Sequence, residues 1–194
     1  MTVRRVCVYC ASSRQSDPLY AEAARRLGQA LAASGIAIVY GGGSVGSMGA
    51  LADGALAAGG TVIGVLPRFM YDLEWGHPGL TELRIVNDLH ERKRLMIEEV
   101  DAVIALPGGS GTLEELLEAI TWKRLGFYFN PIVLVNVGGF FDPMLAQLER
   151  CVAERFMDPR HRQMWIAVAE PDDVVEAIHA APPWDRNARS FAAV

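Results

Sequence analysis

Residues 107–115, with the sequence PGGSGTLEE, are the part of this chain best suited to chemistry. They follow an apolar run at 101–106 that predicts a buried strand, and Leu113, Leu116 and Ile120 then repeat at helical spacing. The glycines are therefore expected at a strand-to-helix turn. The first N–H groups of a helix have no partner within it, and the helix dipole is positive there, so this turn suits a phosphate.

A second turn of the same kind lies upstream, where the apolar run 36–40 meets GGGSVGSMG at 41–49 and a helical stretch follows. The glycines satisfy G-x-G-x-x-G, which between a strand and a helix indicates a nucleotide-binding turn. A dinucleotide site needs an acidic residue for the ribose after the next strand, but the strand predicted at 61–66 ends in proline and arginine. The pattern therefore favours a mononucleotide-like ligand over NAD.

The two turns, with Arg92 and Lys93 between them, resemble the LONELY GUY family of cytokinin-activating phosphoribohydrolases. That family's PGGxGTxxE motif is complete at 107–115, and its YGGGSxGxMG motif is complete at 40–49. The resemblance covers roughly residues 4–180, with both motifs in the expected order and spacing. It implies a hydrolase that cleaves the N-glycosidic bond of a nucleoside 5′-monophosphate, works without a metal or cofactor, and forms a homodimer with its site near the interface.

The resemblance also assigns roles to individual residues. Arg92 and Glu115 match the catalytic positions of the family. Lys93 matches a substrate contact, and matching positions point to Glu74 and Thr121 as further contacts. Together with the two glycine turns, the expected substrate-binding residues are Glu74, Lys93, Gly108, Gly109, Ser110, Gly111, Thr112, Thr121, Gly42, Gly43 and Ser44.

Glu115 has two interpretations on its pattern alone. In the first, Thr112-x-x-Glu115 is a capping box, in which the threonine caps the helix and the glutamate bonds back to it. In the second, Glu115 is catalytic, because glycosidic cleavage places positive oxocarbenium character on the ribose and a fixed carboxylate stabilises that charge in the transition state. The same carboxylate could hold or deprotonate the attacking water. A glutamate beside a phosphate site is repelled unless its charge is used, which favours the second interpretation.

Arg92 begins a predicted helix on the ligand side of the sheet, because residues 86–88 end a strand there. Its guanidinium suits a phosphate or paired hydroxyls and stays charged at any useful pH. The alternative is a surface arginine in a charged helix start. Between the two glycine turns, four apolar and aromatic residues either line a pocket for the base or belong to the core: Phe69, Met70, Tyr71 and Trp75.

Apolar runs and helical stretches alternate along the chain, which predicts a single α/β domain. The expected strands are 4–11, 36–40, 61–66, 83–86, 101–106, 131–137 and 165–169, and the expected helices are 18–33, 47–58, 89–100, 112–125, 140–156 and 171–180. Strands that are apolar on both faces imply a parallel sheet with helices on both sides, a doubly wound Rossmann-like fold. Ligands of such folds lie beyond the carboxyl ends of the strands, where both glycine turns are expected. Residues 1–181 form the domain, and 182–194 are expected to be a C-terminal tail.

The composition fits one soluble domain. The chain has 194 residues, of which 51% are hydrophobic, and its net charge of −5 gives no electrostatic footprint for nucleic acid. No span approaches the length of a membrane helix, and the first apolar run is shorter than a signal-peptide core, so we expect a cytoplasmic protein. The three cysteines indicate no disulfide framework, and Cys7 and Cys10 are expected to be buried thiols.

Several other chemistries lack their residues. The four histidines show no metal-ligand spacing, and neither a G-x-S-x-G elbow nor a Walker lysine is present. Sequences of this kind have been labelled lysine decarboxylases, but a pyridoxal enzyme needs a Schiff-base lysine, and the only lysines, Lys93 and Lys123, have no obvious pyridoxal site around them.

The favoured function is hydrolysis of a purine nucleoside 5′-monophosphate, preferably of an N6-substituted adenine (a cytokinin nucleotide), to free base and ribose 5-phosphate. The alternatives are an AMP-preferring nucleosidase of the same chemistry, a non-catalytic carrier of a nucleotide or of molybdenum cofactor, and an oxidoreductase, which the missing ribose acid disfavours. A homodimer is also expected, because Ala119 and Trp122 share a helix face with Glu115 and a partner subunit would cover the tryptophan. The alternative is a tryptophan packed within its own subunit.

Overall fold

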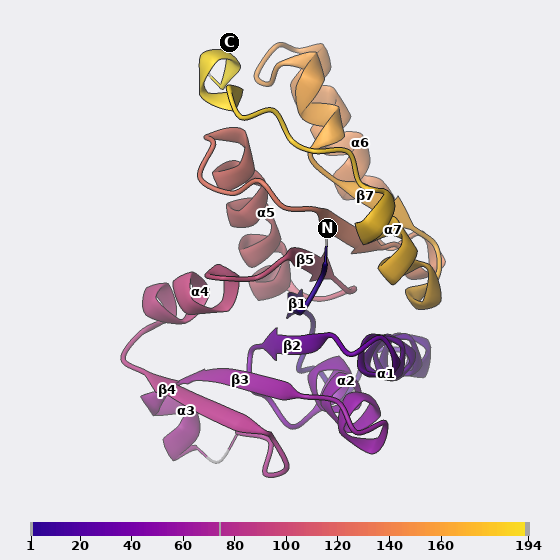
Figure 1. The fold of residues 1–194 in the computed structure, drawn as a ribbon, viewed down its shortest axis with the longest axis vertical. Coiled ribbons are helices and arrows are strands. Elements are labelled where there is room, and N and C mark those ends of the chain that lie inside the picture. The colour runs from indigo at the N-terminus through magenta and orange to yellow at the C-terminus, as the bar shows by residue number, and fades with distance from the viewer. Residues whose placement is uncertain (1, 74, 193–194) are drawn as a thin grey trace.

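Seven short strands pair into one sheet in the computed structural model, which describes residues 2–73 and 75–192 (Figure 1). Their order is β4-β3-β2-β1-β5-β6-β7, and every pairing is parallel. The strands are β1 (Arg5–Tyr9), β2 (Ala37–Tyr40), β3 (Val62–Pro67), β4 (Glu82–Val86), β5 (Ala102–Ala105), β6 (Ile132–Val135) and β7 (Ile166–Val168). The predicted parallel sheet is confirmed. Each strand begins and ends within two residues of its expected bounds.

The inner strands are buried on both faces. All residues of β3, β5 and β6 are buried, and β1 is buried from Val6 onward. In the register of the sheet, Val8 lies opposite Tyr40 on one side and Ile104 on the other. A strand covered on both faces needs apolar side chains at successive positions, which explains the continuous apolar runs in the sequence.

Two layers of helices cover the sheet, one on each face (Figure 1). The helices are α1 (Pro18–Ala33), α2 (Gly46–Ala57), α3 (Arg68–Asp72), α4 (Leu89–Ile97), α5 (Ser110–Arg124), α6 (Asp142–Ala153) and α7 (Val174–Ala180), with short 3-10 turns at Val137–Gly139, Pro159–Gln163, Pro171–Asp173 and Ala188–Phe191. Buried residues of α1, α2 and α7 form one core cluster with the sheet, and those of α4, α5 and α6 form the other. The doubly wound fold is therefore confirmed. No helix in the described part of the chain is long and apolar enough to cross a membrane.

The C-terminal segment, predicted to be a tail, packs onto the domain as far as it is described. Trp184, Ala188 and Phe191 are buried in the same core cluster as α5. The Trp184 Nε1 group donates a hydrogen bond to the carbonyl of Lys123 at 2.9 Å, and Arg189 Nε donates to the carbonyl of Leu125 at 3.1 Å. These contacts hold the segment against the C-terminal end of α5.

The order of the strands places a ligand site between β1 and β5. The chain builds β1, β2, β3 and β4 outward in one direction and then returns to β5 on the other side of β1. The loops that leave the carboxyl ends of β1 and β5 therefore run to opposite faces of the sheet. A crevice opens between such loops, and open α/β sheets bind their ligands there.

Candidate active site

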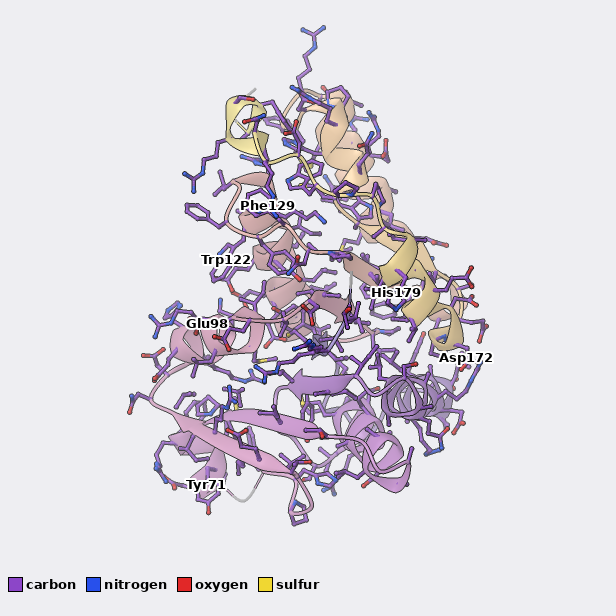
Figure 2. All side chains as sticks on the ribbon, in the orientation of Figure 1. Tyr71, Glu98, Trp122, Phe129, Asp172 and His179 are labelled. Atoms are coloured by element: carbon purple, nitrogen blue, oxygen red, sulfur yellow. The ribbon has the colours of Figure 1, made fainter. Side chains whose placement is uncertain are left out.

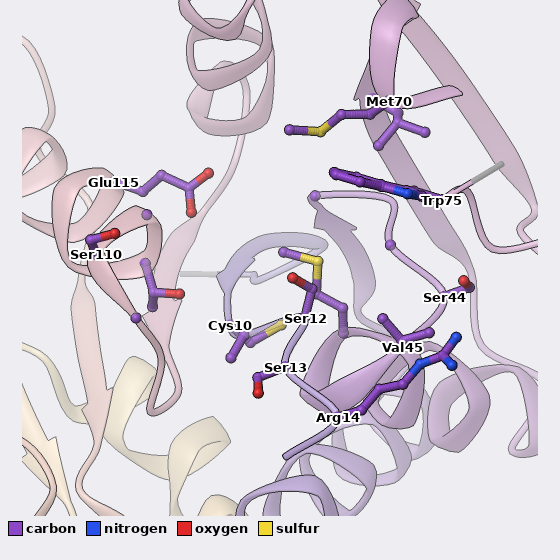
Figure 3. Close-up of a pocket in the computed structure, with 18 of the residues that line it drawn as sticks. Cys10, Ser12, Ser13, Arg14, Ser44, Val45, Met70, Trp75, Ser110 and Glu115 are labelled. Atoms are coloured by element: carbon purple, nitrogen blue, oxygen red, sulfur yellow. The ribbon is translucent and has the colours of Figure 1, made fainter. Parts of the chain in front are cut away.

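A cavity of about 660 Å³ lies at this crevice (Figure 3). The loops after β1, β2 and β5 form most of its wall, and residues from β3, α4 and the segment around α3 complete it. Both glycine turns predicted from the sequence line it. The two turns, although their first residues are 66 positions apart in the chain, therefore belong to one site, as the fold prediction required.

The second glycine turn leads directly into α5. Gly109 is the N-cap residue, and the Leu113 N–H bonds back to the Gly109 carbonyl at 3.0 Å. The preceding N–H groups, of Ser110, Gly111 and Thr112, have no acceptor within the helix. A Cβ atom on Gly109 or Gly111 would meet nothing within 4 Å, so the space above these glycines is open. Unpaired N–H groups beside open space are what an anion site at a helix N-terminus requires.

The capping-box interpretation of Thr112 and Glu115 is wrong. Because α5 begins at Ser110, two residues earlier than predicted, Thr112 lies inside the helix and Glu115 lies in its second turn. The N-cap makes no side-chain hydrogen bond. Thr112 is buried against Gly108 instead, where a Cβ atom would overlap its hydroxyl. Glu115 is therefore free to act on other groups.

Glu115 and Arg92 form a buried ion pair at the cavity wall. Glu115 Oε1 lies 3.3 Å from Arg92 Nη1, and the two side chains are only 7% and 10% exposed. Burial raises the pKa of Glu115 to about 6, because the charged form loses its hydration, while the neighbouring Arg92 acts in the opposite direction and keeps the increase small. Glu115 is therefore mostly ionised at neutral pH and close to a pKa useful for acid–base chemistry.

Arg92 is not a surface residue, so that alternative is wrong. Its Nε donates to the Val65 carbonyl at 3.1 Å and its Nη2 donates to the Gly41 carbonyl at 3.3 Å. A Cβ atom on Gly41 would overlap Nη2, so the first glycine of the upstream turn makes room for the guanidinium. Asp88 caps α4 by accepting from two backbone N–H groups and fixes the helix from which Arg92 projects.

The other predicted site residues differ in their relation to the cavity. Those that line the cavity with Arg92 and Glu115 are Gly43, Ser44, Gly109, Ser110, Gly111 and Thr112. Gly42 and Gly108 belong to the two turns but do not line the cavity, and Gly42 has a φ of 78° that favours glycine. Lys93 and Thr121 do not line the cavity: Lys93 pairs with Glu114 and Glu118 on α5, and the Thr121 hydroxyl bonds to the carbonyl of Leu117 at 2.8 Å. Glu74 lies outside the described residues.

The loop after β1 also lines the cavity, although the sequence did not predict it as part of the site. Ser12, Ser13 and Arg14 line the cavity between the two glycine turns (Figure 3). This loop has no glycine motif, and its place in the site depends on β1 being the central strand at the crevice. One sequence feature could have indicated it: two serines and an arginine follow the apolar strand and supply hydroxyl and cationic donors suited to a phosphate.

The four apolar and aromatic residues at 69–71 and 75, expected either in a base pocket or in the core, do not all lie in the same place. Met70 and Trp75 line the cavity. Phe69 and Tyr71 do not line it and are 50% and 46% exposed, with the Arg68 guanidinium 5.7 Å from the centre of the Tyr71 ring. None of the four belongs to the buried core.

Two further predictions concern cysteines and metals. Cys7 and Cys10 are buried free thiols, as predicted, and burial raises the pKa of Cys10, which touches the cavity. Within residues 2–73 and 75–192, no group of three or more His, Cys, Asp and Glu side chains is placed to hold a metal ion.

A family model described as "Possible lysine decarboxylase" matches residues 48–178. A pyridoxal enzyme of that kind needs a lysine in its site. Neither lysine of this chain is placed for this role: Lys93 is held by two carboxylates of α5, and the Lys123 ammonium donates to the Asn130 carbonyl at 2.8 Å, away from the residues that line the cavity. The cavity therefore does not fit pyridoxal chemistry.

Named relatives of the chain carry a different description from that of the family model. The chain is 45% identical over 163 residues, 84% of its length and 73% of the relative's, to a probable cytokinin riboside 5′-monophosphate phosphoribohydrolase of Oryza sativa subsp. japonica. It is 42% identical over 180 residues, 92% of its length and 91% of the relative's, to the cytokinin riboside 5′-monophosphate phosphoribohydrolase of Rhodococcoides fascians. A molybdenum cofactor binding protein from Rippkaea orientalis shares the fold with a TM-score of 0.70 and 25% identity, over 93% of this chain and 98% of that one. The site motifs, the extent of these matches and the fold show that this chain belongs to the LONELY GUY family of cytokinin riboside 5′-monophosphate phosphoribohydrolases.

Proposed function

We propose that the protein hydrolyses the N-glycosidic bond of a purine nucleoside 5′-monophosphate, with an N6-substituted adenine as the favoured base, and releases the free base and ribose 5-phosphate. The observation that carries this proposal is the buried pair of Arg92 and Glu115 beside the free N-terminus of α5 in one cavity. The 40–45% identity to named phosphoribohydrolases over most of the chain supports the same reaction.

The phosphate of the substrate binds at the first turn of α5. The N–H groups of Ser110, Gly111 and Thr112 donate to its oxygens, and the open space over Gly109 and Gly111 admits it. Gly43 and Ser44 approach from the upstream turn, and Gly42 and Gly108 keep both turns in shape. This arrangement needs no cationic side chain at the phosphate, because the helix dipole already favours the anion.

Glu115 and Arg92 act on the ribose. As the bond between C1′ and the base nitrogen breaks, its electron pair leaves with the base, which takes up a proton from the solvent. Positive charge develops on C1′ and the ring oxygen, and the Glu115 carboxylate stabilises that charge more than it stabilises the neutral ground state. The same carboxylate positions the attacking water and accepts a proton from it, for which a pKa of about 6 is suitable. Arg92 holds the carboxylate in place and orients the ribose phosphate.

We also propose a homodimer in the cytoplasm, with the active site near the interface. The outer surface of α4 and α5 carries exposed apolar residues, Leu89 at 44% and Leu117 at 42%, and the ion pair of Lys93 with Glu118 between them. Thr121 lies about 9 Å along the helix axis beyond Glu115 and does not line the cavity, so we assign its predicted substrate contact to a partner's site. Free thiols at all three cysteines suit a reducing compartment.

Trp122 contributes less to this surface than the sequence suggested. It is half-buried against the core of its own subunit and lines a second hollow with Phe127 and Phe129, at the far end of α5 from the active site (Figure 2). Light scattering tests the dimer. A mass near 42 kDa is expected for two chains of 21.1 kDa, and a 21 kDa particle at micromolar concentration would contradict it.

The reaction itself is tested by incubating the protein with AMP and with N6-isopentenyladenosine monophosphate and separating the products by chromatography. Release of free base and ribose 5-phosphate is the expected result, and Glu115→Gln serves as the inactive control. Tight binding of either nucleotide without base release would contradict hydrolysis and favour a nucleotide carrier.

A further inference from the structure

The cavity has two chemically different walls. The wall formed by the loops after β1 and β5 presents hydroxyl and backbone N–H groups and the Glu115 carboxylate. On the other side lie Met70 and Trp75, which Figure 3 shows across the cavity from Ser110 and Glu115. A nucleotide has the same division, with a charged phosphate at one end and a flat apolar base at the other.

Trp75 is the largest apolar group on this wall and is left 53% exposed. The ring also lines a concave cavity, and aromatic side chains that line such cavities are typical of ligand sites. The nearby Tyr71 does not line the cavity and lies against the Arg68 guanidinium instead. The exposed ring therefore faces a cavity that is otherwise lined for a nucleotide.

The backbone around Trp75 is tied to the upstream glycine turn. The Ser44 N–H donates to the Trp75 carbonyl at 3.1 Å, the His77 N–H donates to the Gly42 carbonyl at 2.9 Å, and Gly43 and Gly76 form an antiparallel bridge. The Trp75 N–H in turn donates to the Met70 carbonyl at 3.3 Å. Because these bonds hold it at both sides, Trp75 keeps a fixed position relative to Gly43 and Ser44.

His77 anchors the same segment to α2. Its Nδ1 accepts from the Gly79 N–H at 3.1 Å, so its Nε2 carries the proton that is donated to Asp53 at 3.0 Å. The side chain of His77 is 10% exposed. A segment held by backbone bonds on one side and by this histidine on the other provides a rigid support for an aromatic ring.

We propose that Trp75 is the stacking platform for the purine base and that the protein recognises the base by its flat face on the Trp75 indole. Met70 lies beside the ring and contacts the rim of the base or an alkyl substituent on it. An indole offers no acceptor and only one N–H, so stacking selects for a planar aromatic base and is tolerant of its edge groups. This inference rests on the proposed nucleotide substrate, but not on hydrolysis.

The test uses the Glu115→Gln protein, in which bound nucleotide is expected to stay intact. Calorimetry measures the Kd of AMP and of ribose 5-phosphate with Trp75 retained or changed to Ala or Phe. Base stacking on an aromatic side chain typically corresponds to roughly 5- to 150-fold in affinity. Trp75→Ala should weaken AMP binding by that factor and leave ribose 5-phosphate within about twofold, and Trp75→Phe should retain most of the affinity for AMP.

Tyr71→Ala is the matched control, because it removes a nearby exposed aromatic ring that does not line the cavity. It should change neither Kd. AMP binding that is unchanged in Trp75→Ala would overturn the proposal. So would an equal loss for ribose 5-phosphate, since that result would mean that the substitution disturbs the Ser44 turn. A wild-type protein that releases no base but shows the expected affinities would refute the hydrolase and retain the platform.

Discussion

Replacing Glu115 by glutamine should make the protein more stable and almost inactive. The amide keeps the shape of the side chain and an acceptor for Arg92 but removes the buried charge. The pKa of Glu115 is raised from an ordinary 4.5 to about 6, mainly by burial. At about 1.36 kcal/mol per pKa unit, ionised Glu115 lowers the free energy of unfolding by roughly 2 kcal/mol at pH 7.5.

The pH dependence of this effect has a definite sign. The folded state binds the Glu115 proton more tightly than the unfolded state, so the cost is fully present above about pH 6 and disappears as the pH falls through 4.5. Glu115→Gln does not titrate. Its melting temperature should therefore exceed that of the wild type by roughly 4–8 °C at pH 7.5 and match it near pH 4.

Scanning calorimetry at the two pH values, together with base release from AMP, measures both consequences on one variant. Turnover should fall roughly a hundred- to thousandfold, as is typical when one preorganised charge is lost from an active site. Glu114→Gln is the matched control, because Glu114 is its exposed neighbour and should change stability by less than about 0.5 kcal/mol. A Glu115→Gln protein that is less stable by about 1 kcal/mol and keeps its turnover would refute the reasoning, because Glu115 would then stabilise the fold and take no part in the reaction.

Three other substitutions or conditions follow from the same geometry. Gly41→Ala should cost roughly a hundredfold in kcat with little loss of fold, because the new methyl displaces Arg92, whereas the methyl of Gly43→Ala meets only the flexible Met48 side chain, with its sulfur at 2.8 Å, and should cost less. A nucleoside without its phosphate should lose at least about a hundredfold in kcat/KM, since charge-assisted hydrogen bonds contribute about 1.5–3 kcal/mol each, and a riboside as good as its monophosphate would refute the phosphate site on α5. The kcat/KM for AMP should fall tenfold per pH unit below about pH 6, where Glu115 becomes protonated, and a flat profile down to pH 5 would exclude Glu115 as the required carboxylate.

The parts of the site that were predictable from the sequence are those defined by local pattern. Each glycine turn stands between an apolar run and a helical stretch, and residues close in sequence determine such a join. The order of strands and helices follows from the same alternation, which is sufficient for a doubly wound parallel sheet. The start of α5 was displaced by two residues because Gly109 can serve as a loop residue or as an N-cap, and the pattern does not distinguish these roles.

The remaining features depend on contacts between distant residues. Arg92 is buried because its guanidinium fills the space left by Gly41, 51 residues earlier in the chain. Trp184 makes the end of the chain part of the core by bonding to Lys123, 61 residues before it. Lys93 is drawn to Glu114 and Glu118 once α4 lies beside α5. No periodic pattern encodes such pairings, because they require the relative placement of whole elements.

Bound phosphate should also move the acid limb of the reaction. A dianion at the first turn of α5 adds negative charge near Glu115, and a like charge raises the pKa of a carboxylate. Phosphate oxygens that attract Arg92 would in addition weaken the contact that now does most to lower the pKa of Glu115. Both effects act only in the enzyme–substrate complex, so the acid limb of kcat, which reports the complex, should lie at higher pH than that of kcat/KM, which reports the free enzyme. Coincident limbs would mean that the phosphate binds too far from Glu115 to influence it, and would contradict the placement of the substrate on α5.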